Sequence, residues 1–181
     1  GFSGHSYAVQ HHVRGMNSSI RDYDMARQAG AERTERLAIL QGALDHAESA
    51  ANLGLFENGW VEYQRGNIGL QIRPREEWPR FVAILEHSLE LLRDTDTEFD
   101  VRTALATARA QLGDRDGAFA EMRARLERFP NIERSWLELA DTLAGLGDRQ
   151  STVEVLETML QRFPNHPGAL ARLQAIKEGP K

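Results

Sequence analysis

The chain has 181 residues, of which 41% are hydrophobic and 27% are charged, a composition typical of a folded globular protein. It contains no cysteine, which excludes disulfide bonds, thiolate zinc sites and cysteine nucleophiles. The net charge is −5, and residues 1–98 carry 15 acidic against 10 basic groups, so the chain is a poor candidate for binding nucleic acid.

Targeting signals are not visible in the sequence. No run of apolar residues approaches the ~18 needed to span a membrane, and no basic start precedes an apolar stretch as in a secretory signal. A cytoplasmic location is favoured. Because the chain opens at Gly1 without Met, a removed signal and a periplasmic location are the alternative. The dominance of Arg over Lys indicates a bacterial origin.

The first hundred residues show helical periodicity only in part. Residues 1–16 have no usable period and are expected to be an N-terminal tail, disordered or artificially added. Residues 17–98 are predicted to form degenerate helical hairpins, with a short helix at 17–29. Two long amphipathic helices follow in "AERTERLAILQGALDHAESAANLG" and "EEWPRFVAILEHSLELLRD". Their inward stripes are Leu37, Leu40, Leu44, Ala47 and Ala51, then Phe81, Ile84 or Leu85, Leu89 and Leu92.

Residues 55–73 are ambiguous. Trp60, Tyr63, Ile68 and Ile72 allow a helix, whereas the NG and GN dipeptides are also typical of a short hairpin turn. We favour a helix, because helices on both sides leave little use for a two-stranded ribbon.

Two later segments begin with the same four residues and end with the same four residues. "LGDRDGAFAEMRARLERFPN" and "LGDRQSTVEVLETMLQRFPN" lie 34 residues apart, and both begin with LGDR and end with RFPN. Helically spaced apolar residues precede and follow each LGDR, so each unit is predicted to be a pair of helices. Gly113 and Gly147 end the first helix of each pair, and Pro130 and Pro164 end the second. Identical breaks allow such units to stack at a constant angle.

These units resemble the tetratricopeptide repeat (TPR) family, whose 34-residue pattern pairs two helices. Counting from Glu133 and from Phe99, the residues at the family's places are Trp136, Leu139, Ala140, Leu143, Gly147 and Pro164, and Leu105, Ala106, Gly113, Ala118 and Pro130. The first copy departs from the pattern. Arg102 and Arg109 replace a large residue, and Arg125 replaces a small one, which predicts looser packing or an Arg125 side chain turned toward solvent.

The resemblance implies an all-α fold of stacked antiparallel helical hairpins, a TPR-like right-handed α-solenoid. Two repeats would occupy residues 99–166, and residues 167–178 would form a C-terminal capping helix with a polar outer face. In such repeats the concave face binds a partner, and six residues fall on its places here: Asp100, Thr103, Thr107, Arg134, Leu137 and Asp141. Because Lys and Asn are missing from these places, a clamp for a terminal carboxylate is not expected. The alternative is that this stripe is buried against the rest of the chain.

Four short motifs contain residue types that occur in catalytic, metal or phosphate sites. "GHSYA" (Gly4 to Ala8) has the letters of a nucleophile elbow but no strand before it. His5, His11 and His12 lack the i,i+4 spacing of a zinc pair, and "DTDTEF" lacks the Gly and Glu of a calcium loop, so it is expected to cap the next helix. Interleaved glutamates around Arg123, Arg125 and Arg128 favour a solvated face over a phosphate site.

The sequence therefore predicts a non-catalytic scaffold that binds a partner peptide or helix, with no cofactor and no metal. The alternatives are a helical regulatory or assembly domain of a larger enzyme, or a small-molecule sensor with a pocket around Trp60, Tyr63 and Trp78. Association into a homo-oligomer is left open.

Overall fold

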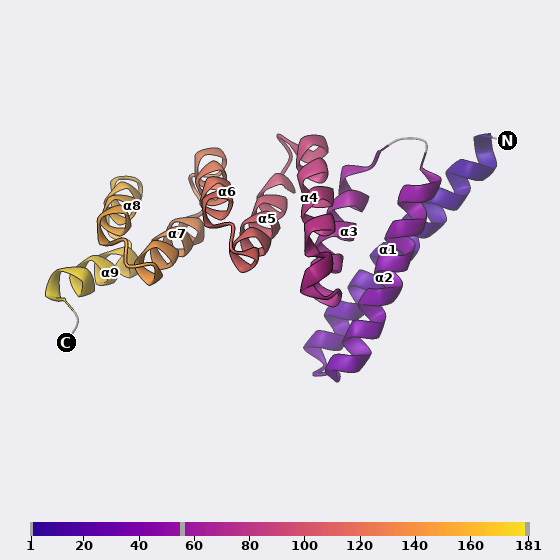
Figure 1. The fold of residues 1–181 in the computed structure, drawn as a ribbon, viewed down its shortest axis with the longest axis horizontal. Coiled ribbons are helices and arrows are strands. Elements are labelled where there is room, and N and C mark those ends of the chain that lie inside the picture. Colours follow the sequence, from indigo (N-terminus) through magenta and orange to yellow (C-terminus); the bar gives the residue numbers. More distant parts are fainter. Residues whose placement is uncertain (1, 55–56, 180–181) are drawn as a thin grey trace. The chain divides into compact units, whose positions relative to one another are not determined.

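The computed structural model describes residues 2–54 and 57–179, and every regular element in these ranges is helical (Figure 1). The α-helices are α1 (Phe2–Gln28), α2 (Arg33–Leu53), α3 (Gly59–Ile72), α4 (Trp78–Leu92), α5 (Glu98–Leu112), α6 (Arg115–Arg128), α7 (Glu133–Gly145), α8 (Arg149–Arg162) and α9 (Pro167–Glu178). A single 3-10 turn, Arg75–Glu77, precedes α4. The predicted all-α fold class is confirmed.

The chain divides into two compact units, residues 1–114 and 115–181. Consecutive helices pack against one another in each, α1 to α5 in the first unit and α6 to α9 in the second. The division falls inside the first predicted repeat, after Asp114, so the repeat boundaries drawn from the sequence stay predictions. Within the ambiguous segment 55–73, residues 59–72 form helix α3, as favoured, and residues 55 and 56 lie outside the described ranges.

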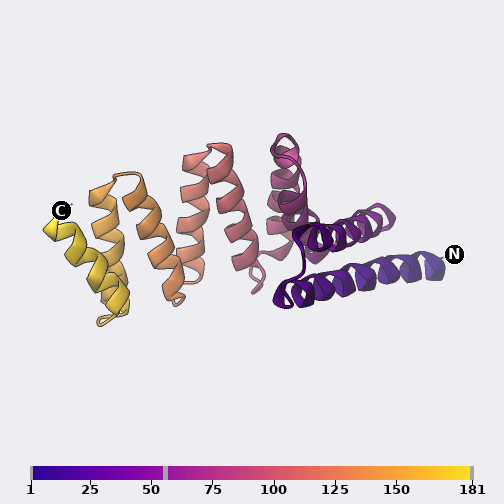
Figure 2. The same ribbon diagram turned by 90° about the horizontal axis from the view of Figure 1, so that it is seen from below.

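The N-terminal segment differs from the expected tail and short helix. A single helix, α1, runs from Phe2 to Gln28 and lies along α2 (Figures 1 and 2). Its apolar residues Val13, Met16 and Ile20 are spaced by 3 and 4 residues, and Met16 is fully buried against Ala47 and neighbouring residues of α2. These apolar residues have helical spacing, but the many polar residues between them make the pattern hard to recognise in the sequence.

Three histidines meet where α1 lies against α2. The imidazole Nδ1 atoms of His12 and His46 are 3.1 Å apart, and the His11 ring lies within 6.3 Å of the His46 ring, centroid to centroid. A Cβ atom on Gly15 would come within 2.6 Å of the His46 ring, so His46 lies directly on the α1 backbone. Between two neutral imidazoles this contact is a hydrogen bond, whereas two imidazolium ions at this distance repel each other.

Acid should therefore weaken the α1–α2 hairpin. Partial burial, and then the charges of His46 and His11, lower the pKa of His12 below its ordinary 6.5. The unfolded chain binds a proton at higher pH than the folded one, so stability should fall as the pH drops below about 6.5. Urea unfolding followed by circular dichroism at pH 7.5 and 5.5 tests this. The loss should shrink in His12→Gln, and an equal loss in both proteins would contradict it.

The helix breaks follow the sequence prediction. Gly113 and Gly147 have φ angles of 90° and 77°, the left-handed region that favours glycine after a helix. Asp148 caps α8 by accepting a hydrogen bond from the Ser151 backbone N–H at 3.0 Å. The predicted cap at residues 94–99 takes another form. The buried Glu98 accepts from the Asp94 backbone N–H at 2.9 Å and pairs with Arg102 at 2.8 Å.

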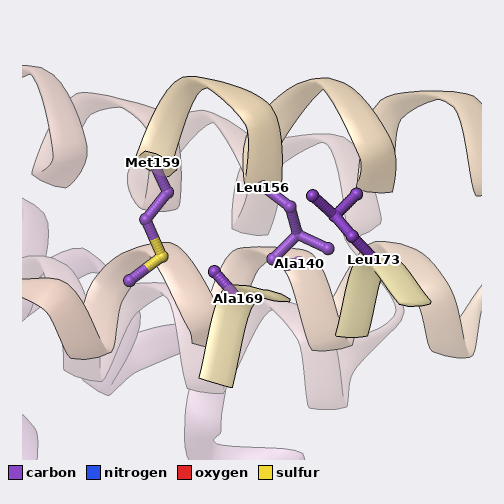
Figure 3. Packing of buried hydrophobic residues seen from close by; sticks show 5 residues of the cluster. All are labelled: Ala140, Leu156, Met159, Ala169 and Leu173. Atoms are coloured by element: carbon purple, nitrogen blue, oxygen red, sulfur yellow. The ribbon is translucent and has the colours of Figure 1, made fainter. Parts of the chain in front are cut away.

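The second unit has its core where α7, α8 and α9 meet. Five buried side chains form it: Ala140, Leu156, Met159, Ala169 and Leu173 (Figure 3). Ala140 and Ala169 are small, so the larger Leu156 and Met159 of α8 can fill the space against both neighbouring helices. Helix α9 thus contributes to this core with one face, while Leu170 on another face is 47% exposed.

Arg125 is not turned toward solvent, contrary to one of the two sequence expectations. It is 2% exposed and its guanidinium lies 2.6 Å from the Glu138 carboxylate on α7. Glu138 also accepts from Arg134 at 2.7 Å, so one carboxylate serves two arginines. The ion pair explains how a charged residue occupies a position that is usually small, because a buried charge is tolerated when it is paired.

Candidate functional site

A groove of about 350 Å³ opens in the first unit, between α3, the start of α4, and α5. Its polar and aromatic lining residues are Tyr63, Asn67, Gln71, Trp78, Asp100, Thr103, Thr107 and Gln111. Three of the six predicted partner-binding residues, Asp100, Thr103 and Thr107, thus line one groove. Two of the three aromatic residues named for a sensor pocket line the same groove.

Helical spacing places these residues together. Asp100, Thr103 and Thr107 are spaced by 3 and 4 residues and share one face of α5. The adjacent face carries Val101 and Leu105, which are fully buried and fix the rotation of the helix. On α3, Tyr63, Asn67 and Gln71 follow one another at four-residue steps.

Several hydrogen-bond donors in the groove already donate to backbone carbonyl groups of the chain. The Thr103 hydroxyl donates to the Phe99 carbonyl at 2.8 Å, and the Thr107 hydroxyl donates to the Thr103 carbonyl at 2.9 Å. The Trp78 indole N–H donates to the Arg73 carbonyl at 3.2 Å, which orients its ring. The two hydroxyl groups therefore present oxygen lone pairs to a ligand.

The pKa values of two ionisable groups of the groove are raised. Burial, and to a lesser degree the Asp100 carboxylate, raises the pKa of Tyr63 to about 12. Desolvation by the surrounding protein also raises the pKa of Asp100 above its ordinary value. Tyr63 is therefore partly removed from solvent, whereas Asp100 remains exposed at the groove.

Alkaline titration should reveal this environment. Ultraviolet absorbance of the wild-type chain minus that of Tyr63→Phe isolates the ionisation of one phenol. We expect a midpoint at about pH 12 for this difference, against the ordinary value of 10.0. A midpoint near 10 in protein that remains helical by circular dichroism would contradict the burial of Tyr63 beside Asp100.

The other three predicted partner-binding residues belong to the second unit. Leu137 packs against the core formed by α7, α8 and α9. The Asp141 carboxylate binds Arg172 of α9 through two hydrogen bonds of 2.6 and 2.8 Å, which lower its pKa. Arg134 extends outward, with a side chain that is 86% exposed, and pairs with Glu138. In this copy all three residues make contacts within the chain, although Arg134 and Asp141 remain exposed.

The remaining motifs do not assemble into chemical sites. Gly4 and Ser6 of "GHSYA" lie inside α1, without the strand and turn of a nucleophile elbow. The side chain of His5 lies outside the described part of the chain. Trp60 is not a lining residue of the groove; its indole N–H donates to Asn17 of α1 at 3.0 Å. Over the described residues, no set of three or more His, Asp or Glu side chains is arranged to hold a metal ion.

Within residues 2–54 and 57–179, the helices are too short or too polar to cross a bilayer.

Comparison with solved structures places the chain among helical-repeat folds. YrrB, described as a TPR protein with an unusual peptide-binding site, superposes with a TM-score of 0.56 and 20% identity, over 90% of this chain and 86% of that one. A structure of MamA gives a TM-score of 0.58 and 16% identity, over 82% and 89% of the two chains. Another MamA structure gives 0.55 and 14%, over 86% and 92%. No family model and no curated protein sequence matches the chain.

Proposed function

We propose that this chain, which has a TPR-like fold of helical hairpins, is a non-catalytic scaffold that binds a segment of a partner protein in the groove between α3 and α5. The supporting observation is that Asp100, Thr103 and Thr107 line an open groove together with the amide side chains of Asn67 and Gln71. An extended peptide presents backbone N–H and C=O groups along its length, and amide side chains pair with both.

The shape of the groove favours a segment over an enclosed small molecule. Gln71, Thr107 and Gln111 are exposed along its length, so a ligand remains open to solvent on one side. Small-molecule sites bury most of their ligand. The likeness to YrrB, which is described as having an unusual peptide-binding site, agrees with this choice. We restrict the proposed site to the first unit, because Leu137 and Asp141 are already in contact with other parts of the second.

A displayed library of randomised peptides tests the proposal. Peptides are first selected for binding to the wild-type chain. The affinity of each selected peptide is then measured for Thr107→Trp, in which a large ring fills the groove. Ala110→Trp is the matched control, because Ala110 is exposed on the same helix but is not a lining residue. We expect peptides that bind the wild type and the control at similar affinity and lose binding to Thr107→Trp. A selection in which no peptide distinguishes the two variants would refute the proposal.

A further inference from the structure

The charge of the groove comes from one residue. Asp100 is the only lining residue among those described that carries a formal charge at neutral pH. No described side chain donates a hydrogen bond to its carboxylate, and desolvation is the cause that raises its pKa. Asp100 is exposed at the groove and has no cationic partner among the described side chains, so a positively charged ligand can pair with it.

The hydrogen-bonding groups of the groove also favour a donor-rich ligand. The hydroxyl hydrogens of Thr103 and Thr107 are donated to backbone carbonyls, as is the indole hydrogen of Trp78. Oxygen lone pairs therefore outnumber free hydrogens around Asp100. A guanidinium group carries five N–H donors and no acceptor, and an ammonium carries three, so both complement this lining.

Neighbouring basic residues do not neutralise Asp100. The two arginines of α5 pair elsewhere, Arg102 with Glu98 at 2.8 Å and Arg109 with Glu86 at 2.6 Å. Residues 1–114 carry 17 acidic and 12 basic groups, so the unit as a whole attracts a cation. Local contacts and long-range charge favour the same kind of ligand.

We infer that the groove between α3 and α5 recognises a basic segment, with an arginine or lysine side chain of the partner paired to Asp100. The inference rests on the proposed function and specifies the chemistry of its partner. The remainder of the segment runs along Asn67, Gln71 and Gln111, whose amides pair with peptide groups. A free amine would gain one half-exposed ion pair, which is worth little by itself, and for that reason we assign the cation to a peptide.

The groove-dependent peptides from the library serve as probes. We expect each to carry an Arg or Lys whose replacement by Gln weakens binding about 2- to 5-fold, as the loss of a half-exposed ion pair would. Asp100→Asn should cause a similar loss, and Asp100→Glu should restore most of the affinity. Added salt should weaken binding to the wild type more than to Asp100→Asn.

Other outcomes separate this inference from the function on which it rests. Peptides that need an open groove but lack a basic residue, and bind Asp100→Asn as well as the wild type, would overturn the inference and leave the scaffold function standing. Arginine amide that binds as tightly as the whole peptide would overturn the assignment to a peptide. Peptides insensitive to Thr107→Trp would instead contradict the proposed function itself.

Discussion

Replacing Leu156 with Ala is expected to destabilise the second unit by about 2–5 kcal/mol, the cost typical of a large cavity in a packed core. Leu156 is fully buried, and its neighbours Ala140 and Ala169 come from the helices on either side of α8 (Figure 3). The alanine side chains are short and cannot extend into the cavity, so the surrounding residues cannot easily fill the space that is left.

The measurement needs a local reporter, since two compact units need not unfold together. Trp136 packs against this core and its indole N–H donates to the Pro130 carbonyl at 2.9 Å. Urea unfolding followed by its fluorescence, in a background with Trp60→Phe and Trp78→Phe, reports on the second unit. Leu170→Ala, at an exposed position of α9, is the control and should change stability by about 0.5 kcal/mol or less. Equal effects of the two substitutions would show that the described core is wrong.

Replacing Gly69 with Ala is expected to destabilise the first unit by about 1–3 kcal/mol, although alanine is the better helix former. A Cβ atom at this position would lie 2.2 Å from two carbons of the Phe81 ring, and Phe81 is 1% exposed. Because the ring is buried, it cannot turn aside into solvent. Gly66 meets Leu85 in the same way, with a Cβ position 2.5 Å from that side chain.

Gly42→Ala is the matched control for this prediction. Gly42 also lies inside a helix, α2, but no atom is within 4 Å of its Cβ position. This substitution should stabilise the chain by about 0.5–1 kcal/mol through helix propensity alone. Urea unfolding followed by circular dichroism compares the two variants. A double-mutant cycle with Phe81→Ala should show strong coupling to Gly69→Ala, and additive effects would contradict the steric explanation.

The regular part of the fold was predictable because its signals are local. Gly113, Gly147 and Pro164 end helices through their own backbone geometry, which depends little on distant contacts. The buried positions Leu105 and Leu139 follow from helical spacing within a few residues. Such features depend on short stretches of sequence and can therefore be predicted from them.

Predictions from the sequence were wrong or ambiguous where the structure depends on contacts between residues far apart in the chain. The GN dipeptide that contains Gly66 suggested a turn, but Gly66 and Gly69 lie inside α3 and let α4 approach it. Only their contacts with Leu85 and Phe81 reveal this role. The stripe containing Met16 is weak because α1 is otherwise polar, and it becomes clear only beside Ala47. The meeting of three histidines likewise depends on how α1 lies along α2.

The candidate site was half predictable for the same reason. Asp100, Thr103 and Thr107 share a helix face, so spacing alone groups them. Their proximity to Tyr63 and Trp78 depends on the packing of α5 against α3 and α4. The two sequence hypotheses, a partner-binding stripe and an aromatic pocket, turn out to concern one groove. Nothing in the local pattern of Asp141 indicated its pairing with Arg172, 31 residues away.

Hydrogen exchange with and without a groove-dependent peptide tests the central claim, partner binding in the first unit, most directly. We predict slower exchange of backbone amides in residues 63–71 and 100–111 of the wild-type chain and of Ala110→Trp, and no change in Thr107→Trp. Protection confined to residues 133–178, with α3 and α5 unaffected, would contradict the claim.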